Sequence, residues 1–447
     1  MEKHISPGIY TKITDIHRKE QPKIIQKDVI QKFNIDNDDS GNMNIKGRLV
    51  FTARARNSVL GLAKLSSHQL LWYSTDNVHW NKMDTNTTVN VAIGTHIYVI
   101  GFLLDNNSET DYTQFRLVNN SSSFEISGSC NAIWNYKSIN FTLLNYCGYC
   151  LFKDCKNIIP TSNFKLEATN LSENCYNSMF QNCTGLTTAP VLAATTLSKG
   201  CYENMFSGCN HLTTAPVLPA TILVDNCYKN MFYGCSNLTT APELPAVTLS
   251  DSCYYQMFRE CTKLTYVPEL PAITLAHLCY YAMFYNCNSL INGPKILPAM
   301  ELLSDGYIEH PASNGDGASQ ANNRYTCYSF MFEKCTKLKK APILPAKQLT
   351  TAAYAGMFRG CTNLETLYIL ADNIFVTGLA NDYLNKNAST LWLFQNGNLY
   401  HLKIFVPPGL KTQWNQLTTY YTNVYNYNVI ELTQEEIDEI RQIYGVK

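Results

Sequence analysis

Cysteine offers the most chemistry in this chain, because thiolates bind metals, act as nucleophiles and form disulfides. The 447 residues include 17 cysteines, all between Cys130 and Cys361. From Cys147 onward the pattern Cys-Tyr-x-x-Met-Phe-x-x-Cys recurs, so most cysteines form pairs eight residues apart. Zinc sites use pairs two to four residues apart with a second pair nearby. Cys147 and Cys150 form the single C-x₂-C pair, and no second one follows. We therefore expect core cysteines and no metal site.

Disulfides are the other chemistry that these cysteines could support. Two residues eight apart on a helix are about 12 Å apart, beyond the roughly 7 Å that a bridge spans. Bridges within one copy of the pattern are thus not expected. Bridges between copies depend on a stacking distance that the sequence does not give. We predict buried, reduced thiols, which pack as small apolar side chains.

No other catalytic constellation stands out. The nine histidines lack metal-ligand or triad spacing, and the chain has no G-x-S-x-G, no Walker loop and no dinucleotide fingerprint. Lys plus Arg and Asp plus Glu both total 35, so the net charge is zero and does not favour nucleic acid. There is no run of about 18 apolar residues and no apolar signal-peptide stretch after Met1. The prediction is a non-enzyme without cofactor, nucleic-acid partner, membrane insertion or Sec export.

The cysteine pattern marks an internal repeat. Successive first cysteines are 28, 26, 26, 26, 26 and 48 residues apart, and Ala353 takes the place of an eighth. The first cysteines are Cys147, Cys175, Cys201, Cys227, Cys253, Cys279 and Cys327. A repeat of this length predicts a solenoid, in which stacked copies bury one another's apolar faces.

Each copy reads as a short helix, a short strand and a proline-rich return. In the copy that begins at Cys227, apolar residues at offsets 0, 1, 4, 5 and 8 form one stripe on a helix. Leu-Thr-Thr-Ala before Pro242 is typical of a strand of about four residues, which proline then ends. Stacking predicts one methionine and one phenylalanine ladder, formed by Met179, Met205, Met231, Met257, Met283, Met331 and Met357 and by Phe180, Phe206, Phe232, Phe258, Phe284, Phe332 and Phe358.

The segment Met-Phe-x-x-Cys-x-x-Leu-Thr-x-Ala-Pro resembles the BspA-like leucine-rich repeats, over about half the chain. That family is known for bacterial surface adhesion and for binding host proteins, and similar repeats occur in gut bacteria and their phages. The resemblance implies a binding scaffold. The predicted fold is therefore mixed α/β: an N-terminal arm (1–35), a small β-sandwich (36–145), a leucine-rich-repeat solenoid of eight repeats (146–370) and a C-terminal cap (371–447).

The sandwich is predicted from strand-like runs that begin at Leu49, Leu70, Val89, Ile97 and Phe115, with polar turns between them. The segment from Tyr73 to Trp80 resembles the Asp-box hairpin of sialidase propellers, with Asp76 at its centre. It occurs once and lacks the glycine of that motif. A turn with a packed tryptophan is therefore the preferred interpretation, and a glycan-active enzyme is a remote one.

The N-terminal arm is polar and carries seven basic against four acidic residues. Its opening Ser-Pro-Gly-Ile-Tyr resembles the start of phage contractile tail sheath proteins over about ten residues. The assembly residues in that resemblance are Pro7, Gly8, Ile9 and Tyr10. A strand lent to a neighbouring subunit would explain such an arm. A disordered terminus would explain it equally well.

An insertion at about 300–324 separates the sixth and seventh repeats and contains Asp305, Tyr307 and Asn322. Insertions of this kind emerge on one face of a solenoid and often bind ligands, although a tolerated bulge is an equal alternative. Near the C-terminus, Thr433 and Glu436 predict a capping box for a last helix.

The residue after each ladder leucine should point outward from its strand. This places Thr213, Thr239, Thr265 and Lys339 in an exposed row that could make many weak polar contacts. The leading hypothesis is a structural and binding protein of a phage particle, assembled in the host cytoplasm. Its arm would attach to other virion proteins, and its repeats would contact a host cell-surface protein or glycan. The alternative is a bacterial cell-surface adhesin of the BspA-like type. The sequence does not decide whether the protein forms a homo-oligomer.

Overall fold

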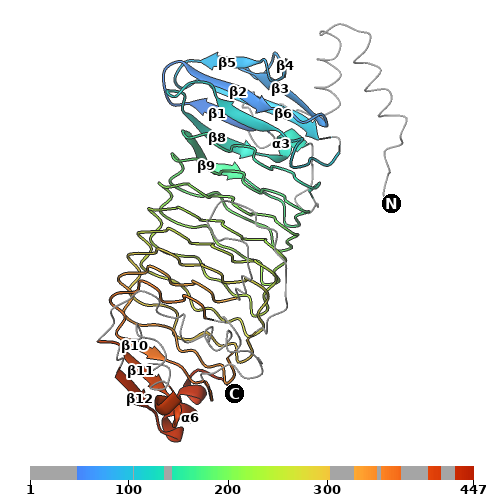
Figure 1. The fold of residues 1–447 in the computed structure, drawn as a ribbon. Coiled ribbons are helices and arrows are strands. Elements are labelled where there is room, and N and C mark those ends of the chain that lie inside the picture. Colours follow the sequence, from blue (N-terminus) through green and yellow to red (C-terminus); the bar gives the residue numbers. More distant parts are fainter. Residues whose placement is uncertain are drawn as a thin grey trace, which may run out of the picture.

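The computed structural model describes residues 48–103, 105–134, 143–302, 327–349, 354–373, 401–413 and 428–446. Within these residues, a pair of sheets is followed by a column of stacked coils and by a small sheet with a helix (Figure 1). The regular structure is mostly β, with few helices. The predicted arm, including Pro7, Gly8, Ile9 and Tyr10, lies outside the described residues.

Two sheets form the N-terminal part. Their strands are β1 (Leu49–Ala53), β2 (Ser58–Lys64), β3 (Gln69–Ser74), β4 (Asn81–Met83), β5 (Thr88–Val91), β6 (His96–Leu103), β7 (Gln114–Leu117), β8 (Phe124–Ser129) and β9 (Ile158–Lys165). One sheet has the order β4-β3-β6-β1-β8-β9, and the other has the order β5-β2-β7. The ring centroids of Phe51 in β1 and Phe115 in β7 are 5.0 Å apart, so the two sheets share a core.

The strand-like runs of the sequence fall on β1, β3, β5, β6 and β7. The strands β2 and β8 were not among them, although both lie next to the core. Strand β8 reads Phe-Glu-Ile-Ser-Gly-Ser, and its polar residues alternate with buried Phe124 and Ile126. That alternation is the available signal for a strand with one buried face. The short helix α3 (Asn131–Trp134) follows β8.

The first coil of the column is continuous with the N-terminal sheets. Strand β9 belongs to this coil and pairs in parallel with β8, with Phe124 opposite Ile158. The ring of Phe152 stacks on Phe115 at 5.7 Å and on Phe180 of the second coil at 5.3 Å. The division predicted at residue 145 therefore lies between two parts that share one hydrophobic core.

The segment predicted as a short helix in each repeat is instead a run of turns, so that prediction is wrong. In the fourth coil, Asn226, Asn230 and Gly234 have φ of 57°, 53° and 72°. The Lys229 amide donates to Asn226 in its own coil at 3.2 Å, whereas the Phe232 amide donates to Met257 of the next coil at 2.9 Å. An α-helix tolerates neither left-handed residues nor amides directed to a neighbouring segment. A residue with positive φ recurs at every fourth position and interrupts the helical conformation.

The predicted four-residue strand is also too long. Each of these coils contributes an isolated parallel bridge, and Thr214 pairs with Thr188 on one side and with Thr240 on the other. Pro242 lies two residues after Thr240 and has no amide to extend the ladder. Longer parallel strands occur at the two ends of the column, in β9 and in β10 (Thr366–Tyr368).

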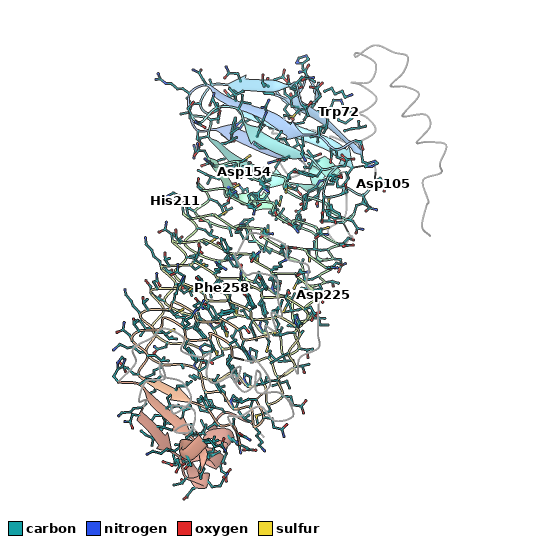
Figure 2. The ribbon with its side chains drawn as sticks, viewed as in Figure 1. Trp72, Asp105, Asp154, His211, Asp225 and Phe258 are labelled. Atoms are coloured by element: carbon teal, nitrogen blue, oxygen red, sulfur yellow. The ribbon has the colours of Figure 1, made fainter. Side chains whose placement is uncertain are left out.

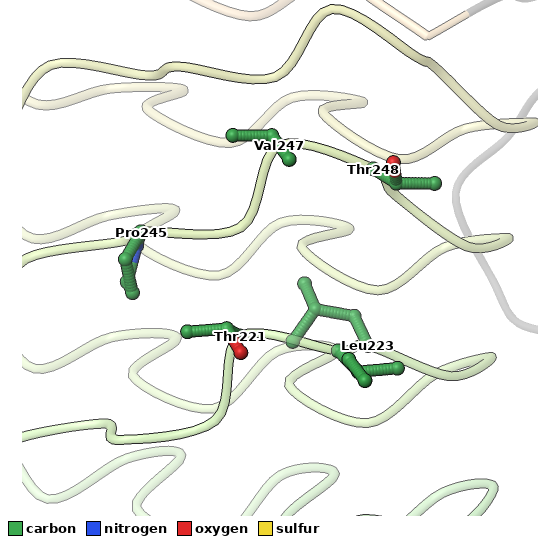
Figure 3. A pocket seen from close by; sticks show the side chains of 6 residues that line it. Thr221, Leu223, Pro245, Val247 and Thr248 are labelled. Carbon is green, nitrogen blue, oxygen red and sulfur yellow. The ribbon is translucent and has the colours of Figure 1, made fainter.

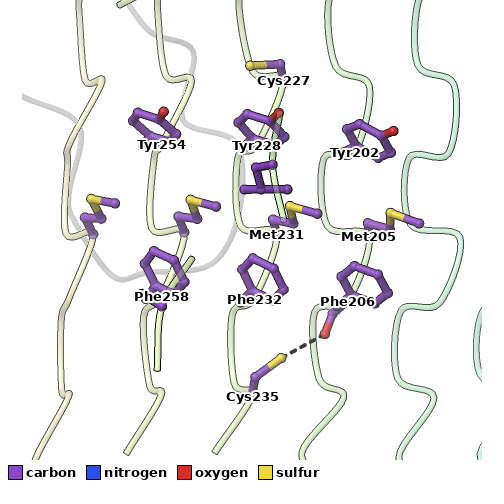
Figure 4. Packing of buried hydrophobic residues seen from close by; sticks show 14 of the residues in the cluster. Tyr202, Met205, Phe206, Cys227, Tyr228, Met231, Phe232, Cys235, Tyr254 and Phe258 are labelled. Atoms are coloured by element: carbon purple, nitrogen blue, oxygen red, sulfur yellow. Dashed lines mark hydrogen bonds between the residues drawn. The ribbon is translucent and has the colours of Figure 1, made fainter. Parts of the chain in front are cut away.

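The predicted methionine and phenylalanine ladders are confirmed. The ladder methionines and phenylalanines have no exposed surface, and neighbouring phenylalanine rings stack at 5.3 to 5.9 Å (Figure 4). Phe258 lies midway along the column (Figure 2). A tyrosine ladder runs beside them, for example from Tyr202 to Tyr228 at 6.0 Å. The stack continues across the insertion, because Phe284 and Phe332 are 5.4 Å apart.

All 17 cysteines are free and buried, as the thiol prediction requires. Their surroundings are apolar, and burial disfavours a thiolate. Burial raises the pKa of Cys209 and of Cys335 to about 12, well above the ordinary value of 9.0. These thiols are therefore unreactive parts of the core in the folded protein.

A parallel sheet and a helix follow the last coil. The sheet has the order β10-β11-β12, with β11 at Lys403–Val406 and β12 at Asn428–Glu431. Helix α6 (Gln434–Ile443) begins with the predicted capping box of Thr433 and Glu436. Ile437 of this helix packs in one cluster with Ile343 and Leu370. The helix thus covers apolar side chains of the last two coils.

Candidate binding surface

The predicted row of polar side chains lies on one side of the coils. Thr213, Thr239, Thr265 and Lys339 are all exposed. The amide of Thr239 donates to the carbonyl of Thr213 at 3.4 Å, and the amide of Thr265 donates to Thr239 at 3.0 Å. These bonds hold the threonines one coil apart, directly above one another.

The threonine hydroxyls are partly used within the protein. The hydroxyl of Thr213 donates to the carbonyl of Thr187 at 3.3 Å, and the hydroxyl of Thr265 donates to the carbonyl of Thr239 at 3.2 Å. Each hydroxyl oxygen keeps its lone pairs. The row therefore offers acceptors and methyl groups to a ligand, and its donors serve to join the coils.

The row changes character toward the C-terminal end. Ile291 occupies the position in the sixth coil and is 45% exposed. Lys339 follows in the seventh coil, because its amide donates to the Ile291 carbonyl at 2.8 Å. The Nζ of Lys339 lies 2.9 Å from Oε1 of Glu365 in the eighth coil. This contact holds the pKa of Glu365 below its usual range.

A second exposed row lies beside the first and was not predicted. It consists of the bridge residues Thr188, Thr214, Thr240 and Tyr266, all of them exposed. The available signal was the Thr-Thr pair that follows the ladder leucines Leu186, Leu212 and Leu238. Together the two rows form a strip with two hydroxyl-bearing residues in each of the second to fifth coils.

The turn segments carry an aromatic and cationic column that the sequence analysis missed. The guanidinium carbon of Arg259 lies 4.4 Å from the ring centroid of Tyr285 and 5.6 Å from that of Tyr233. The rings of Tyr255 and Tyr281, in neighbouring coils, stack with their centroids 4.8 Å apart. Neighbours along the column therefore contact the faces of these rings. The column joins coils by cation–π and stacking contacts.

Charged pairs extend this column. The Nζ of Lys229 lies 3.2 Å from Oε1 of Glu203. The Nε of Arg359 donates to Glu333 at 2.8 Å, and the Glu333 residue is 1% exposed. Desolvation raises the pKa of Glu333, although Arg359 opposes the shift. The turn side of the coils therefore pairs its own charges.

The remaining predicted insertion residues lie outside the described part of the chain. They are Asp305, Tyr307 and Asn322. The described coils on either side meet directly, since the Tyr280 amide donates to Cys327 at 3.1 Å. The insertion thus begins and ends at adjoining coils.

Asp76, in the segment that resembles an Asp-box, closes a turn between β3 and β4. Its carboxylate accepts hydrogen bonds from the Ser74 hydroxyl at 2.9 Å and from the amides of Val78 and His79 at 2.8 Å. Its contact with the His79 ring, first among these, holds the pKa of Asp76 far below its usual range. Trp80 packs against the sheet and is 5% exposed. The Asp76 carboxylate therefore stabilises the turn through hydrogen bonds to its own neighbours in the sequence.

In the described ranges, no group of three or more His, Cys, Asp or Glu side chains is placed to hold a metal ion. None of the helices in those ranges is long and apolar enough to cross a membrane.

The chain matches no known family profile and no curated protein. Among solved structures it is similar to a leucine-rich repeat protein from Bacteroides ovatus. The identity is 12%, the TM-score is 0.23, and the alignment covers 73% of this chain and 89% of that one.

Proposed function

We propose that this chain is a non-enzymatic binding protein whose solenoid displays a polar strip to a macromolecular ligand. The observation that carries the proposal is the exposed row of Thr213, Thr239, Thr265 and Lys339, which hold the same position in the third, fourth, fifth and seventh coils. Each position offers a weak contact of its own. A ligand with its own repeat, such as a glycan or an extended protein surface, would engage several positions at once.

We further propose that the particle of a phage is the setting. The arm would attach to other virion proteins, and the strip would face a host cell-surface protein or glycan. The free, buried cysteines support this setting, because virion proteins assemble in a reducing cytoplasm. A bacterial surface adhesin of the BspA-like type is the alternative.

The binding proposal is tested with purified protein on a printed array of bacterial surface glycans and on immobilised host surface proteins. The triple variant Thr213→Lys, Thr239→Lys, Thr265→Lys replaces the row without touching the core. We expect it to lose at least tenfold in retention while its melting temperature stays within a few degrees. The matched control Val191→Lys, Val217→Lys changes residues that are 77% and 79% exposed in neighbouring coils. Equal retention of triple variant and wild type would remove the strip from the binding surface.

The setting is tested separately by deleting residues 1–33. The truncated protein should fold and stay soluble but no longer sediment with purified particles. Sedimentation unchanged by the deletion would assign attachment to another part of the chain. Detection on the surface of intact bacteria, by protease shaving, would favour the adhesin.

A further inference from the structure

A cleft opens between the third and fourth coils of the solenoid (Figure 3). Its lining residues come later in each coil than the threonines of the strip. Its volume is about 310 Å³. It is lined by Thr221, Ile222 and Leu223 of the third coil and by Pro245, Val247 and Thr248 of the fourth. None of these side chains is charged.

The cleft coincides with a break in the hydrogen bonding between coils. Thr195 donates to Thr169 at 3.0 Å, and Ile273 donates to Val247 at 3.0 Å, so the coils on either side are joined at this position. The corresponding amides between the third and fourth coils are those of Leu223, Val247 and Thr248, and they make no backbone hydrogen bond within the described chain. The backbones of the third and fourth coils are therefore not paired at this position, and the cleft keeps unpaired donors from both coils.

The walls of the cleft expose apolar side chains. Of the lining residues, Ile222 is 78% and Val247 is 53% exposed; Ile273, which is equivalent to Val247 in the next coil, lies outside the lining and is 62% exposed. Surface apolar residues are common singly, but a group beside a concave opening marks an interaction site. Contact with a partner would remove this surface from water.

Acidic residues stand beyond both ends of the cleft. Glu243 comes two residues before Pro245, and Asp225 comes two residues after Leu223. Asp251 lies at the same end as Asp225 in the next coil, and all three are exposed. With about 3.3 Å per residue in extended chain, these carboxylates lie within roughly 10 Å of the lining residues. Lys199 holds the position of Asp225 in the second coil, on the side away from the cleft, so the two coils that form the cleft carry acidic residues at both of its ends.

We propose that this cleft binds an extended polypeptide segment of a partner protein, apolar at its centre and basic at both ends. Alternate side chains of such a segment point the same way about 7 Å apart, so successive apolar side chains can enter the cleft. Its backbone can accept from the unpaired amides of Leu223, Val247 and Thr248. Its basic ends would lie near Glu243 and near Asp225. The site is independent of the strip in the proposed function.

The test uses the full chain and a fluorescein-labelled peptide, Lys-Lys-Val-Leu-Phe-Val-Lys-Lys, followed by fluorescence anisotropy. We expect saturable binding that weakens as salt rises. Ile222→Asp and Val247→Asp should each weaken it at least tenfold. Val191→Asp is the matched control, since it adds the same charge at an exposed position in the second coil.

Two more arms separate shape from charge. Replacing the four lysines of the peptide by glutamates should abolish binding, and Glu243→Lys should weaken the basic peptide several-fold. Three results would overturn the proposal: no saturable binding of the basic peptide at low salt, equal binding of the basic and acidic peptides, or an equal loss in Val191→Asp and Ile222→Asp.

Discussion

The Sγ of Cys235 donates a hydrogen bond to the backbone carbonyl of Phe206 in the preceding coil, at 3.1 Å (Figure 4). The same carbonyl accepts from the amide of Cys209 at 3.0 Å. The bond recurs along the column at Cys183, Cys209, Cys261, Cys287, Cys335 and Cys361. Each thiol thus joins two coils while packing as a small apolar group, which accounts for the cysteine at this repeat position.

Replacing Cys235 by alanine should destabilise the protein by about 1–3 kcal/mol, since it removes buried volume and a donor to a buried carbonyl. Cys235→Ser has nearly the same size loss but keeps a donor, so it should be the milder change. Urea unfolding followed by circular dichroism measures both. A serine variant less stable than the alanine variant would show that the bond contributes little.

Phe258→Ala should cost about 3–5 kcal/mol, because it leaves a cavity between two stacked rings. Phe258 lies 5.5 Å from Phe232 and 5.6 Å from Phe284, with no exposed surface. The matched control is Val217→Ala, at a residue that is 79% exposed. Thermal melting compares the two variants, and a melting curve unmoved by Phe258→Ala would contradict the ladder.

The protein should unfold in alkali well before pH 12. Burial raises the pKa of Cys209 to about 12, whereas a thiol in the unfolded chain titrates near its ordinary 9.0. The unfolded chain therefore loses protons first, so this contribution is intact below pH 9 and decreases as pH rises above it. Each such thiol removes about 1.4 kcal/mol per pH unit. Several together exceed a net stability of about 5–15 kcal/mol.

Circular dichroism against pH measures this transition, with absorbance of tyrosinate as a second readout. A variant with Cys209→Val and Cys335→Val has two fewer titrating thiols. Its stability should decrease less steeply between pH 9 and 11. A slope identical to that of the wild type would show that these thiols are not the cause.

Alkylation should distinguish folded from unfolded protein by mass. Without reductant, the native protein should take up almost no iodoacetamide, and the denatured protein should take it up at all 17 cysteines. Seven or eight disulfides in the denatured sample would instead indicate an oxidising compartment and favour the secreted adhesin.

The repeat length and the ladders followed from the sequence, but the helix did not. Apolar residues such as Cys227, Met231 and Cys235 are four apart, which suits a helix and a series of four-residue turns alike. The deciding signal lay between them, in Asn226, Asn230 and Gly234, which adopt positive φ. Asparagine and glycine are the residues that do so most readily.

The candidate site was predictable only in part. Thr213 and its equivalents follow from the alternation of a strand, and the structure exposes them. The cleft beside Ile222 was not predictable. The repeat has residues at these positions in every copy, and their types do not show where the hydrogen bonds between coils are missing. Loss of pairing depends on small backbone shifts, which a repeat pattern does not encode.

The contact between Phe284 and Phe332 has a consequence for protein engineering. These rings stack at 5.4 Å although the chain between them is 22 residues longer than between other neighbouring coils, as the 48-residue and 26-residue spacings give. The column therefore tolerates extra sequence after its sixth coil without loss of register. A foreign domain with closely spaced termini could be grafted there, and the solenoid would present it between two coils whose rings still stack.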